Sequence, residues 1–179
     1  ARVSLGSSLP AREQGSSFVR LADGVQTDLS VMKALAARAT LVSSGEAIEL
    51  LLQATRLIEG TPFDAQGYDW SYEHQFNADA SETVESTCLR LAELALVADD
   101  LAAARDAVSR SLKALPLHEP LYRSRMRTEA HAGNLGGVRA AFEELCTRLA
   151  DVDSDAAPST STEVLYRQLV SRPSILRTA

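Results

Sequence analysis

The chain contains two similar stretches: Asp99-Asp100-Leu101-Ala102-Ala103-Ala104-Arg105-Asp106-Ala107-Val108 and, 34 residues later, Gly133-Asn134-Leu135-Gly136-Gly137-Val138-Arg139-Ala140-Ala141-Phe142. Within them, Arg105 matches Arg139 and Ala107 matches Ala141. The same offset brings Ala98 onto Ala132 and Leu115 onto Leu149. The chain therefore repeats itself with a period of 34 residues over part of its length.

A period of 34 residues is typical of the tetratricopeptide repeat, a pair of antiparallel helices that must stack on neighbours to bury its apolar face. A unit starting at Glu85 places the small residue Ala92 where the two helices cross most closely, and Pro116 falls where such units end. The next unit, from residue 119, is less regular because Met126 replaces the small residue. We therefore predict an all-α fold of tetratricopeptide-like antiparallel helix pairs, in a short and degenerate array.

Helical spacing of apolar residues begins at Asp28 and continues almost to the end of the chain. It predicts helices at 28–41, 46–58, 70–97, 101–114, 118–132, 135–149 and 161–170, with a polar linker at 151–159. We expect Asp28 to cap the first of these helices and Thr160 or Ser161 to cap the last. The faces that repeat packing must cover predict a core that includes Ala92, Leu101, Ala104, Val108, Leu112, Tyr122, Met126, Leu135, Phe142 and Leu145.

Residues before 28 follow a different pattern. Apolar and polar residues alternate over 17–27 around Asp23-Gly24, which predicts a short β-hairpin. The chain thus divides into an N-terminal segment at 1–27, a helical domain at 28–172 and a tail at 173–179.

Composition allows one compact domain and argues against two classes of partner. The 179 residues are 45% hydrophobic, and the apolar runs are too short to cross a membrane. The formal net charge of -6 makes the chain a poor nonspecific binder of nucleic acid. Residues 61–100 hold nine acids and one base, whereas 101–150 hold eight bases and five acids. This asymmetry either keeps the domain soluble or orients a partner.

The chain shows no constellation of catalytic or ligand-binding residues. His74, His118 and His131 form neither a His-Glu-x-x-His pair nor a triad spacing. The glycine-rich stretch Gly133–Gly137 lacks the Lys-Ser or Lys-Thr of a phosphate-binding loop. Cys88 and Cys146 have the spacing of buried free thiols, which favours a reducing, cytoplasmic compartment. We predict a protein that is not an enzyme and needs no cofactor or metal.

The predicted partner-binding residues lie on the first helix of two successive pairs, because these helices line the concave side of a repeat array. They are Glu85 and Glu93 in the acidic helix at 82–97, and Arg123, Arg125 and Arg127 in the helix at 118–132. Arg123 and Arg127 also follow Glu119 at four-residue intervals, a spacing that braces a helix by itself. Bracing and recognition of an acidic patch on a partner are both open at this point.

Several segments, read together, resemble a known family. They are Thr27-Asp28 before a helix, Leu57-Ile58-Glu59-Gly60-Thr61-Pro62-Phe63, Tyr68 to Trp70, Leu91 to Leu96, Ala104 to Leu115, Pro116 to Arg123, Met126-Arg127 and Ala132-Gly133-Asn134. Over residues 28–170 the chain is similar to the bacterial transcriptional activation domain of actinobacterial antibiotic-regulatory-protein-type regulators. The resemblance implies an all-helical, tetratricopeptide-like domain that follows a winged-helix DNA-binding domain. It also implies that residues 17–27 correspond to the closing hairpin of that domain, whose recognition helix is absent from this chain.

Two functional hypotheses follow from the resemblance. The first is a regulatory protein-interaction domain of a transcriptional regulator, which contacts a partner protein, a sister protomer or polymerase and does not itself read DNA. The alternative is a tetratricopeptide-like scaffold domain of a cell-envelope protein with no role in transcription. A helix-turn-helix in the preceding sequence would favour the first, and a transmembrane segment the second.

Overall fold

The computed structural model describes residues 26–64 and 75–171, and these residues form seven helices and no strand. The helices are α1 (Asp28–Ala39), α2 (Ser44–Thr55), α4 (Phe76–Val97), α5 (Leu101–Ala114), α6 (Glu119–His131), α7 (Leu135–Val152) and α8 (Thr160–Ser171). The predicted all-α fold is confirmed. The predicted hairpin lies outside the described residues except for Gln26 and Thr27, and residues 70–74 of the predicted third helix also lie outside them.

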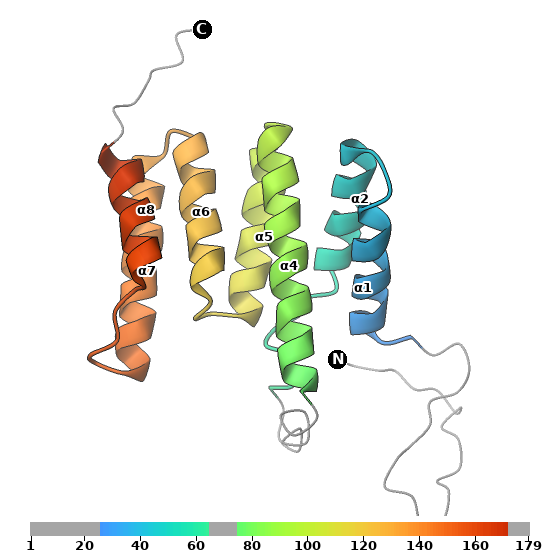
Figure 1. The fold of residues 1–179 in the computed structure, drawn as a ribbon, viewed down its shortest axis with the longest axis horizontal. Helices are drawn as coiled ribbons and strands as arrows, with labels where there is room; N and C mark the ends of the chain where they lie inside the picture. Colours follow the sequence, from blue (N-terminus) through green and yellow to red (C-terminus); the bar gives the residue numbers. More distant parts are fainter. Residues whose placement is uncertain (1–25, 65–74, 172–179) are drawn as a thin grey trace, which may run out of the picture.

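The helices stack as successive pairs in two layers (Figure 1). Helices α1, α4, α6 and α8 form the layer nearer the viewer, with α2, α5 and α7 behind them. The pairs are α1 with α2, α4 with α5, and α6 with α7; each second helix also contacts the first helix of the next pair. Within the near layer, α1 contacts α4, α4 contacts α6, and α6 contacts α8. The stack therefore ends in α8, which stands where the first helix of a further pair would begin.

The sequence period is also a structural period. Asp99 and Gly133 occupy equivalent turns and both adopt a left-handed backbone, with φ of 58° and 71°. The next residues, Asp100 and Asn134, cap α5 and α7 with nearly identical backbone angles, φ -87° and ψ 78° against φ -88° and ψ 78°. Each side chain accepts a hydrogen bond from the amide three residues on, at 2.9 Å and 3.0 Å. The 34-residue offset thus repeats the turn and the cap as well as the helices.

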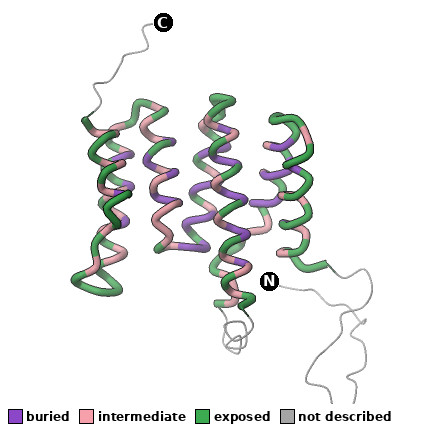
Figure 2. The backbone as a smooth tube through the Cα atoms, viewed as in Figure 1, coloured by how far each residue is buried: buried purple, intermediate pink, exposed green. Residues whose placement is uncertain are grey.

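The predicted core faces the neighbouring helices, as Figure 2 shows for the buried residues in general. Seven of the ten predicted core residues are buried, and Leu101, Leu135 and Phe142 are half-buried. Ala92 and Met126 hold equivalent positions one period apart, and both are fully buried. The α6–α7 pair therefore accommodates a long side chain where the α4–α5 pair has a methyl group.

Helix ends differ from the prediction by a few residues. The cap of α1 is Thr27, not Asp28: the Thr27 hydroxyl accepts a hydrogen bond from the Ser30 amide at 3.1 Å, and Asp28 is already helical. The cap predicted at Thr160 or Ser161 is also displaced, because the Ser159 carbonyl accepts the first amide bonds of α8. Helix α7 continues to Val152, into the predicted linker. Adjacent cap-forming residues give the sequence no means of choosing between them.

Replacing Leu91 tests the packing of α4. Leu91 is 0% exposed, and Leu91→Ala is expected to lower the free energy of unfolding by about 2–5 kcal/mol, because it leaves a cavity between helices. Leu41, 84% exposed, provides the matched control, and Leu41→Ala should change stability by less than about 0.5 kcal/mol. Urea unfolding followed by circular dichroism measures both. Equal effects of the two substitutions would contradict the packing described here.

Candidate functional site

The residues predicted to bind a partner lie on α4 and α6, which contact each other in the near layer. Glu93 and Arg127 are exposed, as a partner-binding surface requires. The Glu93 side chain is 71% exposed and lies 4.0 Å from Arg90. Arg127 makes no ion pair or hydrogen bond within the part of the chain that the structure describes. These two side chains remain the accessible members of the predicted surface.

The other predicted residues are engaged within the molecule. Glu85 lies 3.3 Å from the ring nitrogen Nδ1 of His118, just before α6, and so joins α4 to that helix. Arg123 points toward α8 and donates to the Thr162 hydroxyl at 3.0 Å. Whether these residues also bind a partner stays a prediction, but their contacts give each of them a structural role first.

Arg125 does not share a wall with Arg123 and Arg127. Residues two apart on a helix differ by about 200° in direction, so Arg125 points to the opposite side of α6. There its Nη1 lies 2.6 Å from Oε2 of Glu144 on α7. The expectation that the three arginines form one charged wall of a groove is therefore wrong for Arg125.

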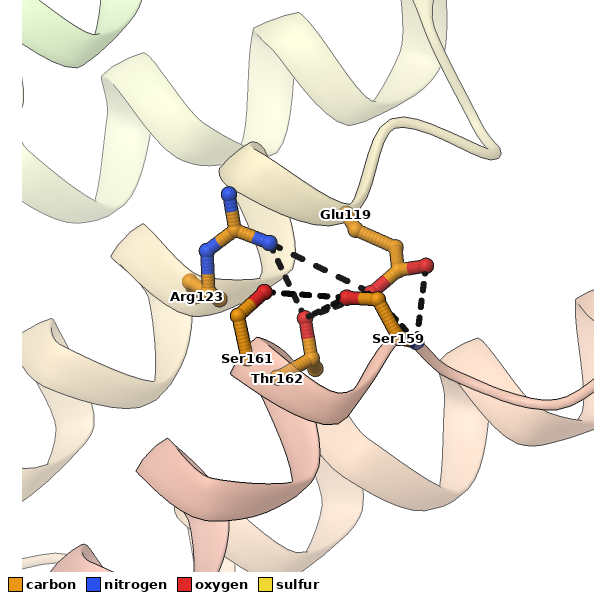
Figure 3. A network of polar contacts seen from close by, with 5 residues as sticks. All are labelled: Glu119, Arg123, Ser159, Ser161 and Thr162. Carbon is orange, nitrogen blue, oxygen red and sulfur yellow. Dashed lines mark hydrogen bonds and ion pairs between the residues drawn. The ribbon is translucent and has the colours of Figure 1, made fainter.

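A polar network joins the start of α6 to the start of α8 (Figure 3). The Ser159 amide donates to both carboxylate oxygens of Glu119 at 3.0 Å, and the Ser159 hydroxyl donates to Oε2 at 2.5 Å. The Thr162 hydroxyl, which is fully buried, also donates to Oε2 at 2.5 Å. Arg123 lies 4.0 Å from the same oxygen. One carboxylate thus fixes the last helix of the stack to the preceding pair.

The Glu119 carboxylate is held in its charged form. Partial burial acts to raise its pKa, but the hydrogen bonds from Ser159 and Thr162 and the charge of Arg123 outweigh burial, so the pKa lies below its ordinary value. The sequence indicated only the pair of Glu119 with Arg123 along one helix. The partners Ser159 and Thr162 lie about 40 residues further on, and no periodicity links them to Glu119.

A second polar region lies between α5 and α7, with α6 as its floor; we call it the α5–α7 groove. It encloses about 660 Å³. Its charged residues are Arg105 and Lys113 on α5, Arg125 and Glu129 on α6, and Glu144 and Arg148 on α7. Arg105 binds Glu129 through two hydrogen bonds of 2.8 Å, and Arg148 donates to Glu144 at 3.0 Å.

Electrostatics in this groove favour charged carboxylates. The hydrogen bond from Arg105 is the main reason that the pKa of Glu129 is lowered. Burial acts to raise the pKa of Glu144, but Arg125 and Arg148 together lower it. Burial, with Glu144 nearby, raises the pKa of Tyr122 to about 12, so its hydroxyl stays protonated and donates to the Pro116 carbonyl at 3.2 Å. No group here is prepared to exchange a proton at neutral pH.

An apolar cavity of about 660 Å³ lies between α1, the connection at 56–64 and α4. Its apolar lining includes Leu29, Met32, Leu57, Ile58, Ala80 and Val84, and it also has three carboxylates, from Asp28, Glu59 and Asp64. Residues 65–74, which continue the connection, lie outside the described residues. The lining holds no nucleophile paired with a base.

The described residues offer little reactive chemistry. Both cysteines are free; Cys88 is buried, and burial raises the pKa of its thiol to about 12. Cys146 is half-buried rather than fully buried as predicted. His118 and His131 each face a carboxylate, Glu85 and Asp99, whereas His74 lies outside the described ranges.

Two searches of residues 26–64 and 75–171 gave nothing. No group of three or more histidine, cysteine, aspartate or glutamate side chains is placed there to hold a metal ion. None of the helices in those ranges has the length and apolar character needed to span a membrane.

Comparison of the chain with models of protein families, with characterised proteins and with solved structures gave no match. The family resemblance drawn from the sequence therefore stays a prediction.

Replacing Glu119 tests the network that holds α8. In Glu119→Gln the amide of the new side chain meets the donors of Ser159 and Thr162, so we expect a loss of about 1–3 kcal/mol of unfolding free energy at neutral pH. Glu93→Gln, at an exposed position on α4, is the control and should change stability by less than about 0.5 kcal/mol. Urea unfolding gives both values, and equal values would show that the network contributes nothing.

The same network predicts how stability depends on pH. A carboxyl group whose pKa is lowered in the folded state stabilises the fold above its unfolded pKa, and that stability is lost as pH falls through the folded pKa. The unfolding free energy of the chain should therefore fall as pH drops below the ordinary glutamate value of 4.5. The fall should be smaller in Glu119→Gln, which has lost one of the lowered groups. Parallel curves for the two proteins would mean that Glu119 is not linked to folding.

Proposed function

We propose that this chain is a regulatory protein-interaction domain of a transcriptional regulator, which binds a partner protein or a second copy of itself and does not read DNA. The observation that carries the proposal is the stack of helix pairs itself. Such a stack buries its apolar residues between successive helices and leaves its helix faces free for contacts. The resemblance of residues 28–170 to the bacterial transcriptional activation domain supplies the link to transcription.

The near layer is the surface we assign to the partner. Glu93 on α4 and Arg127 on α6 are exposed on helices that contact each other, and they carry opposite charges. Exposed charges of this kind contribute on the order of 0–1 kcal/mol each, so they select and orient a partner more than they hold it. A partner segment with charges of both signs fits this pattern.

Transcript levels in the parent organism test the proposal. Deleting the segment that encodes this chain should change the levels of a set of transcripts. The variant Glu93→Lys with Arg127→Glu should reproduce that change without loss of the protein, because it reverses both exposed charges. The control is Glu49→Lys with Arg38→Glu, two exposed residues on the first pair, and it should behave as wild type.

The outcomes separate function from surface. Unchanged transcripts in the deletion strain, with altered envelope permeability, would contradict the transcriptional role and favour an envelope scaffold. A transcript change on deletion that the double variant does not reproduce would keep the function and overturn the surface.

The chain alone should show no saturable binding to duplex DNA at physiological salt. Its net charge of -6 opposes the phosphate backbone, and the excess of base among residues 101–150 is largely paired with carboxylates in the α5–α7 groove. Fluorescence anisotropy of labelled duplexes measures this. A sequence-specific, submicromolar complex formed by the chain alone would overturn the prediction.

A further inference from the structure

The α5–α7 groove carries more positive than negative charge, although the chain as a whole is acidic. Its lining has four bases, Arg105, Lys113, Arg125 and Arg148, and two acids, Glu129 and Glu144. With these side chains charged, the groove has a formal excess of two positive charges in a protein of net charge -6. A local charge of the opposite sign to the rest of the surface is a candidate contact site for an acidic segment.

The excess is located at two places in the groove. Arg105 and Glu129 neutralise each other through two hydrogen bonds of 2.8 Å. Arg125 and Arg148 share the single carboxylate of Glu144, at 2.6 Å and 3.0 Å, which leaves one positive charge on that side. The other unbalanced charge is Lys113 on α5, which is exposed and has no ion-pair partner within the described part of the chain.

An exposed acidic segment follows directly on the wall that carries Arg148. Residues 151–155, Asp151-Val152-Asp153-Ser154-Asp155, are all exposed, and Val152 is 70% exposed. The Asp155 amide donates to Oδ1 of Asp153 at 3.0 Å, so the segment already has a turned shape. Its three carboxylates make no ion pair with the residues that the structure describes.

The basic groove and the acidic segment are neighbours on one side of the molecule. Arg148 and Val152 are four residues apart on α7, so their side chains lie on the same side of that helix. Pro116, at one end of the groove, and the α7–α8 connection both lie at the lower end of the stack in Figure 1. A patch in which opposite charges lie side by side is complementary to itself when a second copy is turned by a two-fold axis.

We propose that two copies of this chain associate through these elements, with residues 151–155 of each copy seated in the α5–α7 groove of the other. The acidic segment meets Lys113 on one wall and the Arg125–Arg148 pair on the other. The exposed side chain of Val152 meets the apolar part of the lining, Val108, Leu112 and Pro116. This inference rests on the proposed function, because it names the second copy as the partner of one surface.

Sedimentation velocity over a concentration series tests the proposal on the chain as it exists. We expect a reversible equilibrium between monomer and dimer. Removing the acidic charges, with Asp151→Asn, Asp153→Asn and Asp155→Asn together, should raise the dissociation constant by about tenfold or more. Asparagine keeps a side-chain acceptor at position 153, so the turn is retained. Reversing the free groove charge, with Lys113→Glu, should have a similar effect.

Matched controls separate local charge from net charge. Glu49→Gln, Glu59→Gln and Glu82→Gln remove three exposed carboxylates elsewhere, and Arg38→Glu reverses a base in the last turn of α1, as Lys113→Glu does in α5. Neither control should weaken the dimer. Thermal unfolding of every variant identifies any that fails to fold.

Mixing the two dimerisation variants gives the sharpest result. The Lys113→Glu copy keeps its acidic segment and the triple asparagine copy keeps its groove, so a mixed dimer regains one intact contact. It should be tighter than either variant alone. A wild-type chain that stays monomeric, variants no weaker than their controls, or a mixture no tighter than its components would each overturn the proposal. None of these results would alter the outcome of the transcript measurement, which tests the proposed function separately.

Discussion

The constraint on which the structure depends is that no helix pair of this chain can cover its own apolar surface. Helix α4 shows this most directly, because it contacts α1, α2, α5 and α6. Leu91, Ala92 and Ala95 are all fully buried along it. Small residues let the neighbouring helices approach closely, and each new pair then presents an apolar face that needs the next pair. The order of the helices in space follows from this requirement.

Such a stack must also end, and α8 ends it. Its inner side packs on α6 and α7, where the rings of Phe142 and Tyr166 stack at 4.1 Å with their planes 8° apart. Its outer side is largely polar, as the last element of a repeat array requires for solubility. The Glu119 network fixes the first turn of α8, so one carboxylate positions the helix that closes the array.

The sequence predicted what repeats and did not predict what occurs once. The 34-residue offset was sufficient for the α4–α5 and α6–α7 pairs, and the turns at Asp99 and Gly133 follow it in their backbone angles. The Glu119–Ser159 contact joins segments with no periodic relation, so nothing in one sequence indicates it. Arg125 was misplaced for a different reason: its direction on α6 could have been calculated from helical geometry. The function rests on surfaces, which the packing rules leave unspecified.

The central claim is that residues 26–64 and 75–171 form one stack in which the inner helices support the outer ones. Hydrogen exchange measured peptide by peptide tests it most directly, because amide protection reports the stability of each element. The account predicts the slowest exchange in α4 and α5, which have neighbours on both sides, and faster exchange in α1 and α8 at the ends. Protection in α1 or α8 equal to that in α4, or two halves that exchange independently, would contradict it.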